Sequence, residues 1–180
     1  MNEPAHRASV DTIWSWLRQV PDPEIPVISV VDLGIVRDVR WDRQDANADV
    51  VVTVTPTYSG CPATEVIAAS IRDRLAEEGI DHARVETRLS PAWTTDWLDA
   101  GAKEKLRGYG IAPPAGPAGE HVIDISRLTR RSTMKAEPAV ACPRCGSMHT
   151  KVLSPFGSTP CKSLHRCDDC HETFDYFKPH

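Results

Sequence analysis

Cys142-Pro-Arg-Cys145 and Cys167-Asp-Asp-Cys170 decide the fold of the C-terminal part of the chain. Two Cys-x-x-Cys pairs can supply four thiolates to one Zn(II) ion, at metal–sulfur distances of about 2.3 Å. Short β-prone runs around the pairs favour a zinc ribbon of hairpins over a finger that carries a recognition helix. About forty residues bury too little apolar surface to fold alone, so the metal would supply the missing free energy. We expect a four-cysteine, metal-folded module, in which the spacing leaves iron open in place of zinc.

The six cysteines also allow disulfides or redox-active thiols. Residues 1–7 hold no apolar run typical of a secretory segment, and the sequence has no apolar stretch of about eighteen residues. We therefore expect a cytoplasmic protein without membrane insertion. Structural disulfides are rare in that reducing compartment, which favours the metal site.

Length and charge limit the function classes. With 180 residues, the chain has room for one domain with a sizeable core and a small appendage. The formal net charge of -4 argues against a general nucleic-acid binder, because binding to phosphates requires clustered Lys and Arg. We expect protein partners and no nucleic acid.

A Pro- and Gly-rich stretch separates two parts of the chain. Residues 111–119 read IAPPAGPAG, which is typical of an extended spacer. The polar residues 127–137 continue it, and residues 121–125 could add an edge strand between the two stretches. The predicted organisation is a domain over residues 9–110, a linker over 111–138 and the ribbon over 139–180.

Helix and strand patterns alternate before this linker. Apolar residues recur at helical spacing from Val10 to Val20, with Ser9 as a plausible N-cap. This order predicts an α+β domain in which helices pack on a three- or four-stranded mixed sheet. The further strands are predicted at 35–41, 50–55 and 83–89, and the further helices at 62–79 and 95–107. The buried stripe of the long helix is predicted to be Val66, Ile67, Ser70, Ile71 and Leu75.

Cys61 lies directly before Pro62, at the start of the long predicted helix. Free amide donors and the positive end of the helix dipole favour a thiolate there, so we expect a reactive thiol. The alternative is a small buried hydrophobe, which is the usual role of a lone cysteine. Asp22 and Glu24 could face the same cavity, although Asp before Pro is also typical of a simple turn.

The loops of the predicted domain resemble those of a known family. Four motifs resemble, in order and spacing, the signature of the MIP18 (DUF59) family: Asp22-Pro-Glu-Ile-Pro26, Asp32-Leu-Gly34, Thr57-Tyr-Ser-Gly-Cys-Pro62 and Pro91-Ala-Trp93. Ribbon motifs resemble the PaaD/PaaJ family of accessory proteins from bacterial phenylacetyl-CoA ring-epoxidase systems: Phe156-Gly-Ser-Thr159, Cys161-Lys162, Arg166-Cys167 and Phe174-Asp-Tyr-Phe-Lys178. The resemblance covers nearly the whole chain apart from residues 1–8 and 111–139.

This resemblance implies an accessory role. In the related systems a di-iron oxygenase subunit activates phenylacetyl-CoA with O2 and NADPH, and a flavin and iron-sulfur reductase subunit supplies the electrons. This chain has no paired Glu-x-x-His motifs and no Gly-rich dinucleotide fingerprint, so we expect no catalysis by it alone. MIP18-type domains are associated with iron-sulfur cluster assembly or transfer. The resemblance therefore implies a transient cluster at Cys61, with Asp22 or Glu24 assisting, and the oxygenase and reductase subunits as partners.

One cysteine cannot hold a cluster that normally needs four thiolates. A second copy in a homodimer, an exogenous thiol or the carboxylates would have to complete the site. Cys161 is surplus to the zinc shell and is a possible additional thiol, with packing inside the ribbon as its alternative. Two other function classes stay open. A structural subunit would tolerate loss of Cys61, and a thiol-dependent enzyme would need a base beside it, although no His is near in the sequence.

Overall fold

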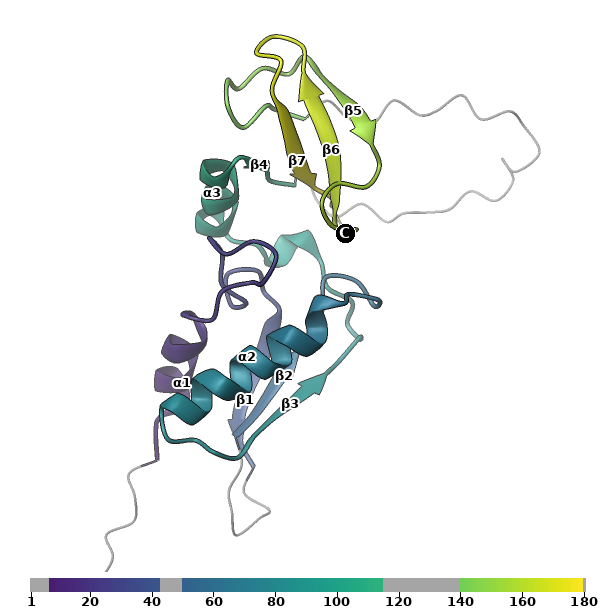
Figure 1. Cartoon of the computed structure of the whole chain (residues 1–180). Coiled ribbons are helices and arrows are strands. Elements are labelled where there is room, and N and C mark those ends of the chain that lie inside the picture. Colours follow the sequence, from purple (N-terminus) through teal and green to yellow (C-terminus); the bar gives the residue numbers. More distant parts are fainter. Residues whose placement is uncertain (1–6, 43–49, 115–139, 180) are drawn as a thin grey trace, which may run out of the picture. The chain divides into compact units, whose positions relative to one another are not determined.

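The structure is a computed structural model that describes residues 7–42, 50–114 and 140–179 (Figure 1). The chain divides into two compact units. The first comprises the chain up to Trp93 together with residues 97–102, and the second comprises residues 94–96 and the chain from Lys103 onward. No helix among the described residues is long and apolar enough to cross a membrane.

A three-stranded mixed sheet forms the centre of the first unit, as the sequence predicted. β1 (Val36–Trp41) pairs antiparallel with β2 (Val50–Val54), and β2 pairs parallel with β3 (Ala83–Thr87). All five residues of β2 are buried, because this strand lies between the other two. α1 (Val10–Leu17) contacts β1, and α2 (Ala63–Glu77) contacts β3 and α1, so both helices pack against the sheet (Figure 1).

Local sequence signals set the ends of the first helix. The side chain of Ser9 accepts a hydrogen bond from the backbone N–H of Thr12 at 3.1 Å, which confirms the predicted N-cap. The helix ends at Leu17, and the next residues form a tight turn in which the N–H of Val20 donates to the carbonyl of Leu17 at 3.1 Å. The apolar period therefore continues for one turn beyond the helix.

The predicted buried stripe of α2 needs two corrections, one of which is that Ser70 is only half-buried. Its buried residues follow a four-residue spacing: Ala63, Ile67, Ile71 and Leu75. Val66 is 51% exposed, so its predicted burial is wrong. It lies about 100° around the helix from Ile67, on a side that the sheet does not cover.

The single helix predicted over 95–107 is divided in the structure. A short 3-10 helix, η1 (Thr95–Trp97), is followed by α3 (Ala100–Tyr109). The side chain of Asp99 accepts a hydrogen bond from the N–H of Ala102 at 2.6 Å, which starts α3 anew. Asp99, a residue type of high N-cap preference, thus starts α3 shortly after η1 has ended.

The second unit is a four-stranded sheet in the order β4-β7-β6-β5. The antiparallel strands β5 (Thr150–Ser154), β6 (Lys162–Cys167) and β7 (Thr173–Phe177) confirm the predicted hairpins of a ribbon. β4 (Ile111–Ala112) adds to them in parallel with β7.

The position of β4 differs from the prediction, in which residues 111 and 112 belong to the linker. Both side chains are apolar and buried, which favours pairing over an extended spacer. Ala112 and Val140 belong to one core cluster, together with Cys142, Cys167, Phe174 and Tyr176. Residues 115–139, including the possible strand at 121–125, lie outside the described residues.

Candidate functional site

The four predicted metal ligands come together in the second unit. The sulfur atoms of Cys142, Cys145, Cys167 and Cys170 all lie within 4.8 Å of one another. The sulfurs of Cys142 and Cys170 are 3.7 Å apart, and those of Cys145 and Cys167 are 3.6 Å apart. A tetrahedral shell with bonds of about 2.3 Å places its sulfurs about 3.8 Å apart. The group therefore fits one tetrahedral Zn(II) or iron ion.

Both cysteine pairs adopt the same local conformation. We call residues 142–147 and 167–172 the first and second knuckle. In the first, the N–H of Cys142 donates to the carbonyl of Ser147 at 2.8 Å, and in the second, the N–H of Cys167 donates to the carbonyl of Glu172 at 2.9 Å. The residue after each pair has a left-handed backbone: Gly146 with φ 76° and His171 with φ 63°.

The electrostatics of the knuckles favour a bound cation. The N–H of Cys170 is the strongest influence on Cys167 and lowers the pKa of that thiol to about 7. The N–H of Glu172 lowers the pKa of Cys170, but burial and the neighbouring sulfurs outweigh it and raise that pKa to about 12. Four thiolates at this spacing repel one another unless a cation lies between them.

The second candidate site lies at one end of the first sheet. β2 and β3 are parallel and α2 connects them, so the carboxyl ends of both strands and the start of α2 lie at the same end. Cys61 precedes α2 at this end and is half-buried. Both the N–H and the hydroxyl of Thr64 donate to the carbonyl of Cys61, at 3.3 and 2.9 Å.

Asp22 folds the loop that carries Glu24. Its side chain is buried, and its Oδ1 accepts hydrogen bonds from the N–H groups of Glu24 at 2.9 Å and Ile25 at 2.8 Å. The N–H of Asp22 donates to the carbonyl of Ile28 at 2.8 Å. This is the turn that the sequence offered as the alternative to a ligand role, and it holds Glu24 in place.

The two carboxylates lie close enough to act on Cys61. Burial raises the pKa of the Cys61 thiol, and although the N–H of Ala63 and the hydroxyl of Thr64 lower it, the charges of Glu24 and Asp22 add to the rise. Desolvation and the two negative charges thus oppose the thiolate that the helix start favours. Cys61, Asp22 and Glu24 thus lie within electrostatic range of one another, and burial and the two charges raise the pKa of the thiol.

The other loops of this end are fixed by backbone and aromatic contacts. Gly34 has a φ of 67°, and a Cβ there would lie 2.9 Å from the Cβ of Trp97. The indole N–H of Trp93 donates to the carbonyl of Leu33 at 2.9 Å. Only glycine therefore fits between the loop before β1 and Trp97.

Sequence reasoning missed Thr64 beside the candidate thiol. Its hydroxyl lowers the pKa of Cys61, opposing the carboxylates. The available signal was its position in the first turn of the helix, three residues after Cys61, where a hydroxyl can reach backwards.

Cys161 lies inside the ribbon. It is 5% exposed, and its sulfur is 3.0 Å from Oγ1 of Thr159. Among the described residues it is outside the four-sulfur group. This placement matches the packing alternative that the sequence left open.

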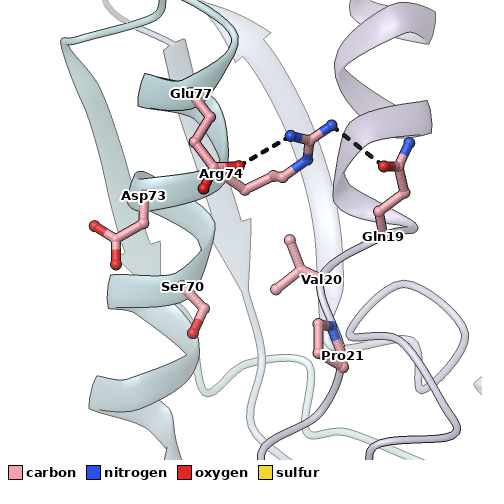
Figure 2. A pocket seen from close by; sticks show the side chains of 7 residues that line it. All are labelled: Gln19, Val20, Pro21, Ser70, Asp73, Arg74 and Glu77. Atoms are coloured by element: carbon pink, nitrogen blue, oxygen red, sulfur yellow. Dashed lines mark hydrogen bonds and ion pairs between the residues drawn. The ribbon is translucent and has the colours of Figure 1, made fainter.

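A hollow of about 230 Å³ lies between the chain after α1 and one side of α2 (Figure 2). Arg74 lines it and contacts Gln19 across the hollow at 3.2 Å and Glu77 on its own helix at 3.0 Å. Its lining residues are Gln19, Val20, Pro21, Ser70, Asp73, Arg74 and Glu77. Cys61, Asp22 and Glu24 do not line this hollow, so it is separate from the candidate thiol site.

Two family models match the chain. Residues 10–86 match the model described as iron-sulfur cluster assembly protein, and residues 127–178 match the PaaD zinc beta ribbon domain. The fold and the four-sulfur group thus define a protein that joins a domain of the iron-sulfur assembly type to a metal-binding ribbon.

The similarity to one relative extends over almost the full chain. A protein of Escherichia coli (strain K12), provisionally named as the D component of 1,2-phenylacetyl-CoA epoxidase, is 47% identical over 94% of this chain and 92% of its own length. The chain belongs to the family of these epoxidase D components. A Porphyromonas gingivalis protein described as an Fe-S protein maturation auxiliary factor is 36% identical over 50% of this chain and 83% of its own length.

A solved structure is also similar. The Bacillus anthracis domain of unknown function DUF59 is 28% identical, with a TM-score of 0.48, and the match covers 53% of this chain and 89% of that chain. The assignment of the fold rests on the sheet topology and the family models.

Proposed function

We propose that this protein is an accessory subunit of a phenylacetyl-CoA epoxidase system that assists iron-sulfur cluster assembly or transfer to the reductase or oxygenase subunit. The similarity to the relative named as the epoxidase D component supports the assignment to this system. The match of residues 10–86 to an iron-sulfur assembly model supports the role in cluster assembly or transfer. The observation that carries the proposal is the placement of Cys61 at the start of α2, within range of the charges of Glu24 and Asp22.

Cys61 is suited to transient rather than resident iron. Burial and, to a smaller extent, the charges of Glu24 and Asp22 raise the pKa of its thiol, so iron competes with a proton that is held more tightly than usual. Once the sulfur is bound to iron, the nearby carboxylates favour the positive metal. One thiol supplies one of the four cluster ligands. A second copy in a homodimer, an exogenous thiol or the client subunit would supply the others, which favours easy release.

The two carboxylates have different roles in this proposal. The charge of Glu24 acts on the Cys61 thiol more strongly than that of Asp22, so Glu24 is the candidate proton acceptor or weak ligand. Asp22 accepts two backbone N–H groups through Oδ1 and acts by holding the loop. Loss of Asp22 would therefore displace Glu24 as well.

We infer that the ribbon holds Zn(II) and has a structural role. The four sulfurs have the separations of a tetrahedral thiolate shell, and Cys142 and Cys167 are part of the ribbon core. We also propose a cytoplasmic location, a reducing compartment in which cysteines such as these six, none of them in a disulfide, stay reduced.

The proposal is tested by metal and sulfide analysis after anaerobic reconstitution. We expect one zinc per chain in the wild type, in Cys61→Ser and in the matched control Cys161→Ser. Iron and acid-labile sulfide should bind to the wild type and to Cys161→Ser only. Uptake by Cys61→Ser equal to the wild type, or no uptake by any of the three, would reject the carrier role.

The second candidate is a structural subunit of the oxygenase complex. Exposed apolar side chains on the ribbon favour it, because they offer a contact surface: Met148, Val152, Leu153 and Phe156 are between 37% and 63% exposed. In that case the protein copurifies with the oxygenase at constant stoichiometry and Cys61→Ser retains full activity of the complex. A thiol-dependent enzyme is disfavoured, since the raised pKa of Cys61 leaves little of the nucleophilic thiolate at neutral pH.

A further inference from the structure

The two residues between the ligands of the second pair contact the segment that follows the first pair. Oδ2 of Asp169 accepts a hydrogen bond from the hydroxyl of Ser147 at 2.5 Å, and its Oδ1 is 3.2 Å from Nδ1 of His149. Oδ1 of Asp168 is 2.7 Å from Nζ of Lys151. The N–H of Asp168 also donates to the carbonyl of His149 at 2.8 Å. Four contacts thus join the second knuckle to the first knuckle and the chain that follows it.

The corresponding residues of the first pair make no such link among the described residues. Pro143 has no N–H to donate, and the guanidinium of Arg144 lies against Gly110, 3.3 Å from the position of a Cβ there. The two knuckles share a backbone conformation, but only the second carries acidic side chains that reach across. The acidic pair is therefore not needed to shape a knuckle, which the first forms without it.

The four cysteine ligands differ in exposure, and the contacts between the knuckles lie on their more exposed side. Cys142 and Cys167 are buried in the ribbon core, whereas Cys145 is exposed and Cys170 is half-buried. A metal can leave without disrupting the core only if the knuckles separate on the side of the two outer ligands. Ser147 follows Cys145 by two residues and Asp169 precedes Cys170 directly, so their hydrogen bond spans that side.

We propose that Asp168 and Asp169 are positioning residues that clasp the two knuckles together and slow the release of the ribbon metal. They do not touch the metal in this role. They hold the outer thiols at coordination distance while a metal–sulfur bond is broken, which favours its re-formation. The inference rests on the proposed metal occupancy of the ribbon, which the zinc content of the wild type measures separately.

The expected effect is moderate because the contacts are exposed. The side chains of Asp169 and His149 are 53% and 79% exposed, and solvent screens their charges. We expect loss of the Ser147–Asp169 bond alone to speed metal release about five-fold, in keeping with one exposed hydrogen bond to a carboxylate.

The test measures the rate of zinc transfer from the full chain to an excess of a chromophoric chelator. Ser147→Ala and Asp169→Ala should each release zinc about five-fold faster than the wild type. Both changes remove the Ser147–Asp169 bond, and Ser147→Ala also removes the acceptor of the His149 N–H, so the double variant should accelerate release by less than the product of the two single effects. Asp169→Ala retains its backbone N–H, which donates to Cys167.

Glu172→Ala is the matched control. It removes one negative charge two residues after Cys170 and keeps the backbone N–H that donates to Cys170. We expect its release rate to equal that of the wild type. The absorption of the Co(II)-substituted proteins verifies that every variant keeps a tetrahedral thiolate shell, and Ser147→Ala tests the clasp even where Asp169→Ala does not fold.

Two results would overturn the proposal. Equal release rates for Ser147→Ala and the wild type would show that the hydrogen bond across the knuckles has no effect. Equal acceleration in Asp169→Ala and Glu172→Ala would show that negative charge near the metal, rather than the clasp, sets the rate.

Discussion

Four sulfur atoms lie within 4.8 Å of one another in the second unit, whereas Cys61 is the one cysteine of the first. Backbone N–H groups point at the ribbon sulfurs and lower the pKa of Cys167, while burial and, to a smaller extent, nearby carboxylates raise the pKa of the Cys61 thiol. The ribbon thus contains a complete ligand shell, and the Cys61 site contains a part of one. A complete shell suits a resident metal, and a partial one suits metal that arrives and leaves.

Removing a buried ribbon ligand should have the largest effect, because it makes the complete ligand shell of the ribbon incomplete. Cys142→Ser leaves three thiolates and takes a residue out of the ribbon core. Structural zinc contributes roughly 10–16 kcal/mol of apparent folding free energy in small zinc modules. We therefore expect loss of the bound zinc and unfolding of the ribbon, measured by elemental analysis and by NMR amide dispersion. A folded ribbon with a full zinc content would show that the ion does not depend on Cys142.

The first unit should depend on backbone geometry instead of metal. Gly34→Ala adds a Cβ that would lie 2.9 Å from Trp97 Cβ, at a φ of 67°. We expect a loss of about 2–3 kcal/mol in the free energy of unfolding, measured by urea titration. Gly60→Ala is the matched control next to Cys61, because its Cβ would meet only Tyr58, at 3.7 Å. Equal losses in both variants would contradict the assigned role of Gly34.

The ribbon contains the opposite case, a non-glycine residue in the left-handed region. His171 has a φ of 63°, where the equivalent position of the first knuckle is Gly146. His171→Gly should raise the midpoint of thermal unfolding, with a gain of about 1 kcal/mol from the relief of the Cβ contact. A lower midpoint would indicate that the imidazole stabilises the second knuckle by more than its backbone costs.

The smallest expected effect tests the charges at Cys61. Glu24→Gln removes a negative charge that raises the pKa of the thiol, so the thiolate fraction at a mildly alkaline pH should increase. We expect alkylation by iodoacetamide to become a few-fold faster, because the thiolate is the reactive form. Asp81→Asn, before β3 and so at the other end of that strand, is the control. An unchanged alkylation rate in Glu24→Gln would show that the charge of Glu24 does not act on the Cys61 thiol.

Features that depend on short stretches of chain were predictable from the sequence. The two cysteine pairs indicated the metal group, Ser9 indicated the start of α1, and the alternation of elements indicated the mixed sheet. Each of these signals acts within a few residues or through a repeated period. The same locality made the turn at Asp22 a recognisable alternative.

Features that depend on distant chain segments were not predictable in this way. Val66 fits the apolar period of α2, but the sheet covers the neighbouring side of the helix. The raised pKa of Cys61 depends on burial and on carboxylates far earlier in the chain, which a helix-dipole argument does not include. Ile111 and Ala112 form β4 because β7, far along the chain, offers a strand edge.

Because β4 pairs with β7, the segment after Ala112 begins and ends in the ribbon core. The chain leaves the ribbon core at Ala112 and re-enters the same cluster at Val140. The intervening residues therefore connect two parts of one core instead of joining one unit to another. A ribbon fragment that begins at Val140 would therefore lack Ala112, a residue of its own core.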